Sequence, residues 1–139
     1  MLQIRVELGI LQLEVEGRPD GLRPGGFKTV LEAIKNTPLT IETAKSLRDE
    51  IIQYEYRAQT LLYLGEHVRA AHDADHMLLA ARLLYEQPPE SLDRDTVLAP
   101  LLRSIAIHAR AIAEASLAGS RTDLAKLALE GGLAELRAL

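Results

Sequence analysis

The feature that most constrains the fold is a pair of apolar stripes with helical spacing between residues 41 and 86. In each stripe apolar side chains recur every third or fourth residue, which keeps them on one side of an α-helix. The first consists of Ala44, Leu47, Ile51, Tyr54, Ala58 and Leu61, and the second of Ala70, Ala74, Met77, Ala81 and Leu84. Gly65 lies between them, where a chain leaving a helix needs a residue that tolerates positive φ. The pattern predicts two long antiparallel helices that bury their stripes together.

A second helical hairpin is expected in residues 91–139, after the consecutive prolines of Gln87-Pro88-Pro89 end the first. The third long helix should end near Ala118, and Pro100 either kinks it or lies in its first turn. Ser120 or Thr122 is the expected cap of the last helix. The apolar positions are Leu98, Leu101, Ile105, Ala109, Ile112 and Ser116 on the third helix, and Ala125, Leu129, Gly132 and Leu136 on the last.

Residues 2–16 follow a period of two, which is typical of a strand. The apolar phase changes near Gly9, and two structures explain the change. One is a long strand with a bulge at Gly9-Ile10. The other is a hairpin that turns at Leu8-Gly9 and pairs Leu2 with Val15, Ile4 with Leu13 and Val6 with Leu11. We favour the bulged strand, because Leu is a poor first residue for a tight turn that needs positive φ.

A lone strand or a two-stranded ribbon is marginal in water, so this edge should find a partner. We expect a homodimer formed through the N-terminal strand, with Leu2, Ile4, Val6 and Leu8 as partner-binding residues.

The length of 139 residues predicts a single domain, residues 1–139. Its expected parts are a β-strand and turn with a loop (1–26), a short helix (27–36), a first helical hairpin (41–86) and a second (91–139). The predicted fold class is mainly α: four long helices in TPR-like antiparallel hairpins, with an N-terminal β-strand or β-ribbon. Gly131-Gly132 costs about 1 kcal/mol per Gly relative to Ala, which close approach of a neighbouring helix would offset.

The composition excludes several classes of protein. A net charge of −4 argues against a nucleic-acid surface, and the absence of Cys excludes disulfides, thiol catalysis and thiolate metal sites. No apolar run approaches the ~18 residues of a membrane span, and no signal peptide is visible. We therefore expect a cytoplasmic protein without nucleic-acid or membrane partners.

The best candidate for chemistry is a pair of histidines four residues apart, His72 and His76. This spacing can supply two metal ligands from one helix face, and His108 is a possible third. Asp73 stands where the hydrolytic zinc helix H-E-x-x-H has its Glu, and Asp is one methylene shorter. The alternative is that both histidines are boundary residues beside the buried stripe, with Arg69 and Asp73 as an i, i+4 ion pair.

No other pattern indicates catalysis or a cofactor. Gly17–Gly21 and Gly25-Gly26 lack the spacing of a phosphate-binding loop, and no Ser lies in a nucleophile motif. The acidic cluster of Glu14, Glu16 and Asp20 is typical of a solvated strand and turn. We expect no catalytic residues and no cofactor.

Two resemblances extend this interpretation. Tyr54, Ala58, Leu61, Gly65, Ala70, Ala74 and Met77 resemble the small-and-large pattern of tetratricopeptide repeats, although the helices are longer. The run from Glu7 to Glu14 (ELGILQLE), continued by Gly17-Arg18-Pro19-Asp20-Gly21, resembles the signature of a family of uncharacterised bacterial proteins. The helical part of that signature is similar to Leu47-Arg48-Asp49-Glu50, Gln53-Tyr54, Arg57, Leu64-Gly65 and Arg69.

Members of that family tend to carry another strand upstream, and some continue into a UvrB/UvrC-like motif, neither of which is evident here. The resemblance implies no activity and carries over no catalytic residue. It strengthens the expectation that the N-terminal strand pairs with a partner.

We therefore expect a non-enzymatic protein–protein interaction or assembly module, since stacked helical hairpins offer grooves for helices or peptides. Tyr54 and Tyr63 join the strand as candidate partner-binding residues, because Tyr is an amphipathic anchor. For the same reason Tyr56 and Tyr85 are further residues to probe. The alternative is a small helical-bundle metal-binding protein or enzyme that uses His72 and His76.

Overall fold

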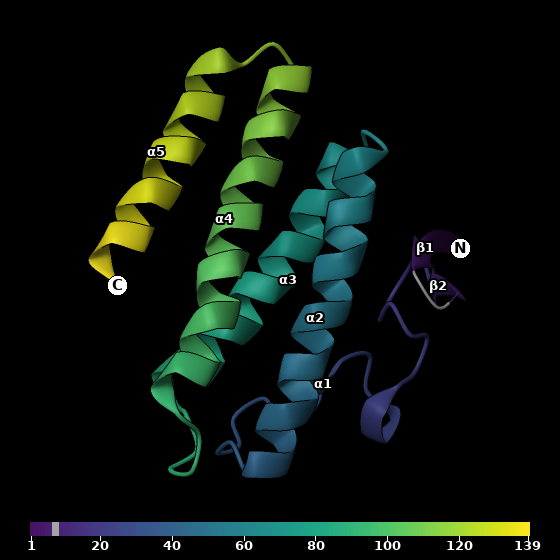
Figure 1. Ribbon diagram of the computed structural model, residues 1–139, viewed down its shortest axis with the longest axis vertical. Coiled ribbons are helices and arrows are strands. Elements are labelled where there is room, and N and C mark those ends of the chain that lie inside the picture. Colours follow the sequence, from purple (N-terminus) through teal and green to yellow (C-terminus); the bar gives the residue numbers. More distant parts are fainter. Residues whose placement is uncertain (7–8) are drawn as a thin grey trace.

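The computed structural model describes residues 1–6 and 9–139 and is mainly helical (Figure 1). Its elements are β1 (Leu2–Val6), β2 (Gly9–Leu13), the 3-10 turn η1 (Pro24–Gly26), α1 (Val30–Ala33), α2 (Ile41–Tyr63), α3 (His67–Glu86), α4 (Arg94–Ala118) and α5 (Thr122–Ala138). The four long helices form two hairpins, α2–α3 and α4–α5, and α3 packs against α4. This confirms the predicted fold class.

The α2–α3 hairpin matches its sequence pattern closely. Every residue of both predicted stripes is buried. Thr40 caps α2, because its hydroxyl accepts a hydrogen bond from the Thr43 N–H. Gly65 has φ +79°, and the Gly65 and Glu66 N–H groups donate to the carbonyls of Leu62 and Leu61. These two bonds satisfy carbonyls that the end of α2 leaves free, and they reverse the chain.

The second hairpin differs from expectation at two points. Helix α4 begins at Arg94 and continues through the buried Pro100, so the alternative in which Pro100 lies in the first turn is wrong. Helix α5 begins at Thr122 with Arg121 at its cap position, so the predicted Ser120 or Thr122 cap is also wrong. Ser120 instead takes φ +57° at the end of α4, and the Arg121 N–H donates to the Ser116 carbonyl.

Helix α4 is the one helix of the described residues that is long and apolar enough to cross a membrane, by length and composition alone. It lies between α3 and α5. A helix buried at the centre of a helical bundle can have the same length and composition.

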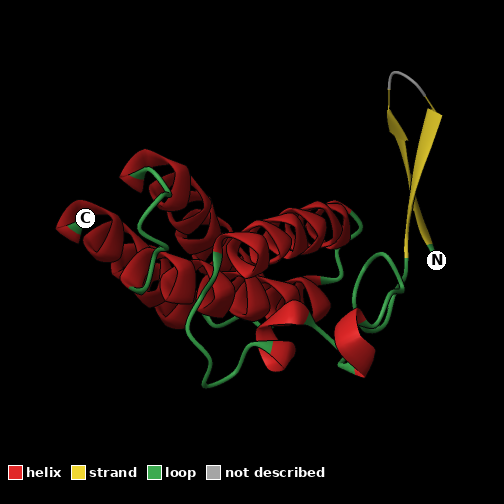
Figure 2. Cartoon of the chain, turned by 90° about the horizontal axis from the view of Figure 1, so that it is seen from below, coloured by secondary structure: helices red, strands yellow, loops and turns green. Residues whose placement is uncertain are grey.

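The N-terminal segment is a two-stranded antiparallel hairpin, so the favoured bulged strand is wrong. The hairpin alternative has the right topology, but its predicted register is off by two residues: Leu2 pairs with Leu13 and Ile4 with Leu11. This register places Leu2, Ile4, Leu11 and Leu13 on one face, where Leu13 is buried and the others are half-buried. The phase change in the sequence arises because β2 pairs antiparallel with β1 in this register. Figure 2 shows the hairpin extending away from the helices.

The short helix is α1, which covers only part of the predicted 27–36. Thr29 caps it by accepting a hydrogen bond from the Glu32 N–H. Val30 and Ile34 are buried in the same cluster as Leu47 and Leu84, so α1 closes one end of the α2–α3 core.

The two adjacent glycines of α5 provide a test of the α4–α5 packing. A Cβ added to Gly132 would lie 2.6 Å from the Cβ of Ala109, whereas one added to Gly131 would meet nothing within 4 Å. Gly131→Ala should therefore stabilise the chain by about 1 kcal/mol through helix propensity. Gly132→Ala should destabilise it, because overpacking costs about 1–3 kcal/mol and exceeds that gain. Urea unfolding at low micromolar protein concentration measures both, and equal effects would contradict the close approach of α5 to α4.

Candidate functional site

A buried ion pair joins α2 to α3. Arg57 makes two hydrogen bonds to Asp73, Nε to Oδ2 and Nη2 to Oδ1, both 2.8 Å long. The third donor, Nη1, binds the Glu14 carbonyl at 2.9 Å. The guanidinium also lies 5.0 Å from the centre of the Tyr54 ring. Such a two-pronged contact fixes both partners in orientation as well as distance, so the end of the β-hairpin is tied to both helices at one point.

The expected i, i+4 ion pair of Arg69 with Asp73 is wrong, because Asp73 pairs with Arg57 instead. Asp73 is only 6% exposed and faces α2, where the guanidinium of Arg57 reaches it. Arg69 lies on the exposed side of α3 and pairs instead with Glu16 at 2.6 Å. The acidic cluster is therefore divided: Glu16 contacts Arg69, while Asp20 accepts a hydrogen bond from Gln53 of α2.

Glu50 is fully buried, with 0% exposure, and is hydrogen-bonded on several sides. It accepts from the Val30 and Leu31 N–H groups at 2.8 and 3.2 Å, and its second oxygen lies 3.0 Å from His76 Nε2. Arg18 Nε lies 3.4 Å away. Burial alone would raise the pKa of Glu50. The bonds from His76 and the two backbone N–H groups outweigh it, so the pKa lies below its usual range.

The predicted turn at Gly17–Gly21 docks on α2 through these contacts. Pro19 is among the fully buried side chains, and Arg18 lies against Glu50. Asp20 of the same turn accepts a hydrogen bond from Gln53, so two neighbouring turns of α2 hold this segment.

The three predicted metal ligands have different surroundings in the structure. His76 stacks on Tyr54, with ring centres 4.0 Å apart, and bonds to Glu50. His72 is exposed and shares with His76 a cavity of about 330 Å³, which Arg57 and Arg69 also line. His108 pairs with Asp75 at 2.7 Å. Residues 1–6 and 9–139 contain no group of three or more potential ligands that could hold an ion. A metal at His72 and His76 stays a prediction.

One exposed groove lies between β1 and the C-terminal half of α2; we name it the β1–α2 groove. Its volume is about 690 Å³, and its lining residues are Met1, Leu2, Gln3, Ile4, Arg5, Tyr56, Gln59, Thr60, Tyr63 and Leu64. Tyr63 is 90% exposed. The groove thus combines a strand edge with exposed aromatic and aliphatic side chains.

Three of the predicted partner-binding residues lie together in the β1–α2 groove: Leu2, Ile4 and Tyr63. Val6 is exposed but does not line it, and Leu8 lies outside the described residues. Tyr54 is buried against His76 in the core, where a partner cannot reach it. Tyr56, which the sequence also offered as a residue to probe, lines the groove too, because it lies seven residues before Tyr63 and so on the same helix face. Tyr85 is half-buried against the core, where its hydroxyl accepts a hydrogen bond from Arg94 Nη2.

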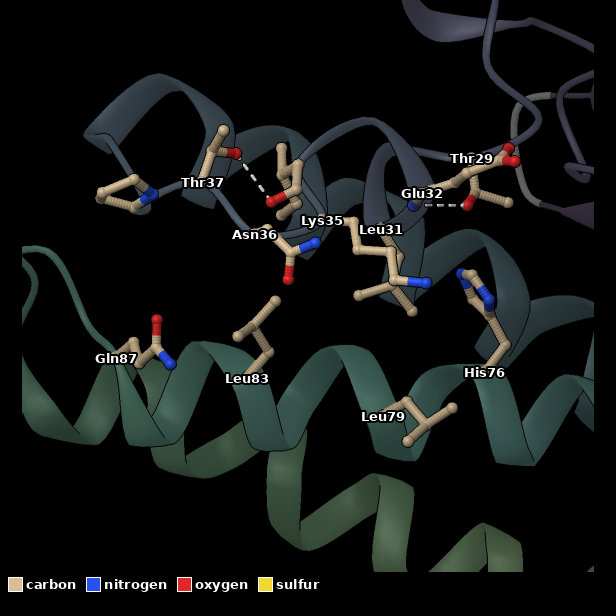
Figure 3. A pocket seen from close by; sticks show the side chains of 12 residues that line it. Thr29, Leu31, Glu32, Lys35, Asn36, Thr37, His76, Leu79, Leu83 and Gln87 are labelled. Atoms are coloured by element: carbon tan, nitrogen blue, oxygen red, sulfur yellow. Dashed lines mark hydrogen bonds between the residues drawn. The ribbon is translucent and has the colours of Figure 1, made fainter.

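A second groove, of about 820 Å³, separates α3 from the segment that contains α1 (Figure 3). Leu31, Leu79 and Leu83 line it, and His76 lies at one end. Two hydroxyls lie along it: Thr29 accepts from the Glu32 N–H, and Thr37 donates to the Ile34 carbonyl.

The buried Arg57–Asp73 pair should dominate the stability of the α2–α3 hairpin. Arg57→Met leaves the Asp73 carboxylate buried and uncompensated, so we expect a loss of about 3–5 kcal/mol in the free energy of unfolding. The matched control is Arg110→Met, whose exposed i, i+4 pair with Glu114 is worth less than about 0.5 kcal/mol. Urea denaturation measures both, and similar losses would contradict the structural role of Arg57.

Glu50 should make the stability depend on pH in the acid range. Because its pKa is lowered in the folded chain, its contribution is complete above the unfolded pKa of about 4.3 and is lost as the pH falls through the lower folded value. Glu50→Gln should cost about 1–3 kcal/mol at pH 7 and less as the pH falls below ~4. The exposed Glu90→Gln is the control. A cost that does not change with pH would argue against ionised Glu50.

Comparison with protein-family models, with curated proteins and with solved structures found no match to this chain. The resemblance to the bacterial family therefore stays a prediction.

Proposed function

We propose that this protein is a non-enzymatic protein–protein interaction module whose binding surface is the β1–α2 groove. The observation that carries the proposal is the convergence of a strand edge with Tyr56, Tyr63 and Leu64 along one groove. Each tyrosine offers a large contact area with few rotatable bonds, so little conformational entropy is lost on binding.

The groove favours an extended partner. The sheet of the described residues has two strands, so each strand has one edge without a β-partner. An added strand would satisfy the backbone N–H and C=O groups of that edge, while its alternate side chains enter the space beside Tyr63. The partner that we propose first is a second copy of this chain, because the copy presents the same unpaired edge.

The contacts of the preceding turn support this function. Arg57 holds the Glu14 carbonyl, and Arg69 pairs with Glu16, directly after β2. Pro19 of the same turn is fully buried. These anchors limit the orientations of the hairpin, and a preformed edge loses less entropy when a partner binds.

Amide hydrogen exchange tests the proposal at the hairpin itself. Exchange of the Leu2–Val6 amides should slow as the protein concentration is raised from micromolar to near-millimolar, because pairing protects the edge. Tyr63→Asp should remove this dependence, since it places a charge in the groove at little cost to a side chain that is already exposed. Phe27→Asp, at an exposed aromatic residue outside the groove, should leave it intact. Exchange that is independent of concentration in the unaltered chain would exclude self-pairing through this edge.

A further inference from the structure

Helix α5 carries two apolar stripes, and only one of them is covered. Ala125 and Gly132 face α4, and Leu136 packs against the core. A second stripe follows the spacing 3, 4, 3, 4: Leu124, Leu127, Gly131, Ala134 and Ala138. All five are exposed, Leu127 by 66%. This spacing is that of a helix seam that contacts another helix.

Within a single chain, no contact requires a glycine at position 131 of this stripe. Its neighbour Gly132 is required by the close approach of Ala109, but a Cβ at position 131 would meet nothing. A glycine in a helix interior weakens the helix, so an uncompensated one is unexpected. Beside Gly131 lies a cavity of about 290 Å³, bordered by Leu127 and, on α4, by His108 and Ile112.

We propose that α5 of a second copy of this chain packs antiparallel along the uncovered stripe. In an antiparallel pair related by a two-fold axis at the level of residue 129, Leu127 lies opposite Gly131 of the second copy. Leu124 then lies opposite Ala134 of the second copy. Each leucine meets a small residue, so the stripe is complementary to itself in size, as a two-fold contact requires. Gly131 provides the space for the facing leucine.

The charges at the two ends of α5 support the same pairing. Arg121 and Asp123 lie at its N-terminal end, and Glu135 and Arg137 at its C-terminal end. Antiparallel packing brings Asp123 toward Arg137 of the second copy on one side of the seam. On the other side Arg121 approaches Glu135 of the second copy, although Glu135 also pairs with Arg82 of its own chain. In a parallel pair each of these residues would face the same residue of the second copy. Like charges would then lie side by side, which is unfavourable.

The antiparallel pairing is also compatible with the negative charge of Glu130 at the middle of the helix. Glu130 would lie near its own copy at the axis, but Lys126 of the same helix pairs with it at 3.7 Å. The opposite exposed flank of α5, which includes Leu129 and Leu133, has no comparable alternation of large and small residues. It therefore provides control positions on the same helix.

This contact is independent of the β1–α2 groove. Both views place α5 and the β-hairpin on opposite sides of the molecule (Figures 1 and 2). The two surfaces can therefore be altered separately, and the tests use the full chain with Tyr63→Asp as background, so that self-pairing of the hairpin does not contribute.

The first test is the mass in solution as a function of concentration, measured by light scattering. As the concentration rises, the mass of the Tyr63→Asp chain should reach twice that of one copy. Leu127→Glu should weaken the dimer at least tenfold, while Leu133→Glu, at an equally apolar exposed position, should not. A background chain that stays monomeric at near-millimolar concentration would overturn the proposal, and so would equal effects of the two variants.

A charge-reversal cycle tests the orientation. Asp123→Arg and Arg137→Asp should each weaken the dimer several-fold, and the double variant should recover most of the loss. Circular dichroism shows whether each variant keeps its helices. Additive weakening in the double variant would exclude the antiparallel pairing.

Because the chain has no Cys, disulfide formation between introduced cysteines gives a third test. When Leu127→Cys and Gly131→Cys chains are mixed and oxidised, the disulfide should join one variant to the other, since positions 127 and 131 face each other across the seam. Predominant disulfides between identical variants would contradict the proposed register.

Discussion

The architecture depends on the Arg57–Asp73 pair, because it is the contact at which α2, α3 and the end of the β-hairpin meet. A charge buried at this position is tolerated only when its partner is present. Arg satisfies the requirement with a planar group that binds both carboxylate oxygens and still offers a donor to the Glu14 carbonyl. Two turns earlier on α2, Glu50 binds the backbone of α1. Helix α2 thus presents an apolar stripe to α3 and a polar one to the N-terminal segment.

The sequence predicted the helices well because their stripes depend only on local spacing, and every stripe residue of the first hairpin is buried. The β-hairpin was harder to predict, since a bulge and a turn produce the same change in the alternation of apolar residues. Leu2, Ile4 and Tyr63 were candidates for binding and do share a groove. Tyr54 belonged to the helical stripe and proved to be core. The Arg57–Asp73 and Glu50–His76 contacts depend on how two helices align, which spacing along one chain does not determine. Burial of Glu50 also runs against the usual preference of acids for the surface.

The proposed surfaces have different physical characters. The β1–α2 groove offers backbone groups and tyrosines, and suits an extended segment. The α5 stripe offers alternating leucines and small residues, and suits another helix. Both contacts would be two-fold and would lie on opposite sides of the molecule. Copies that use both would alternate hairpin-to-hairpin and helix-to-helix contacts in an open row, since two separate two-fold axes need not close into a ring.

The attachment of the N-terminal segment also has a consequence for folding. Its anchors connect residues far apart in the chain: 43 positions separate Glu14 from Arg57, and 53 separate Glu16 from Arg69. The helical hairpins need only local contacts, and closing a short loop costs less entropy than closing a long one. The N-terminal segment can therefore dock only after α2 and α3 have come together. The β1–α2 groove is completed by that docking, so it is the last surface of the described fold to form.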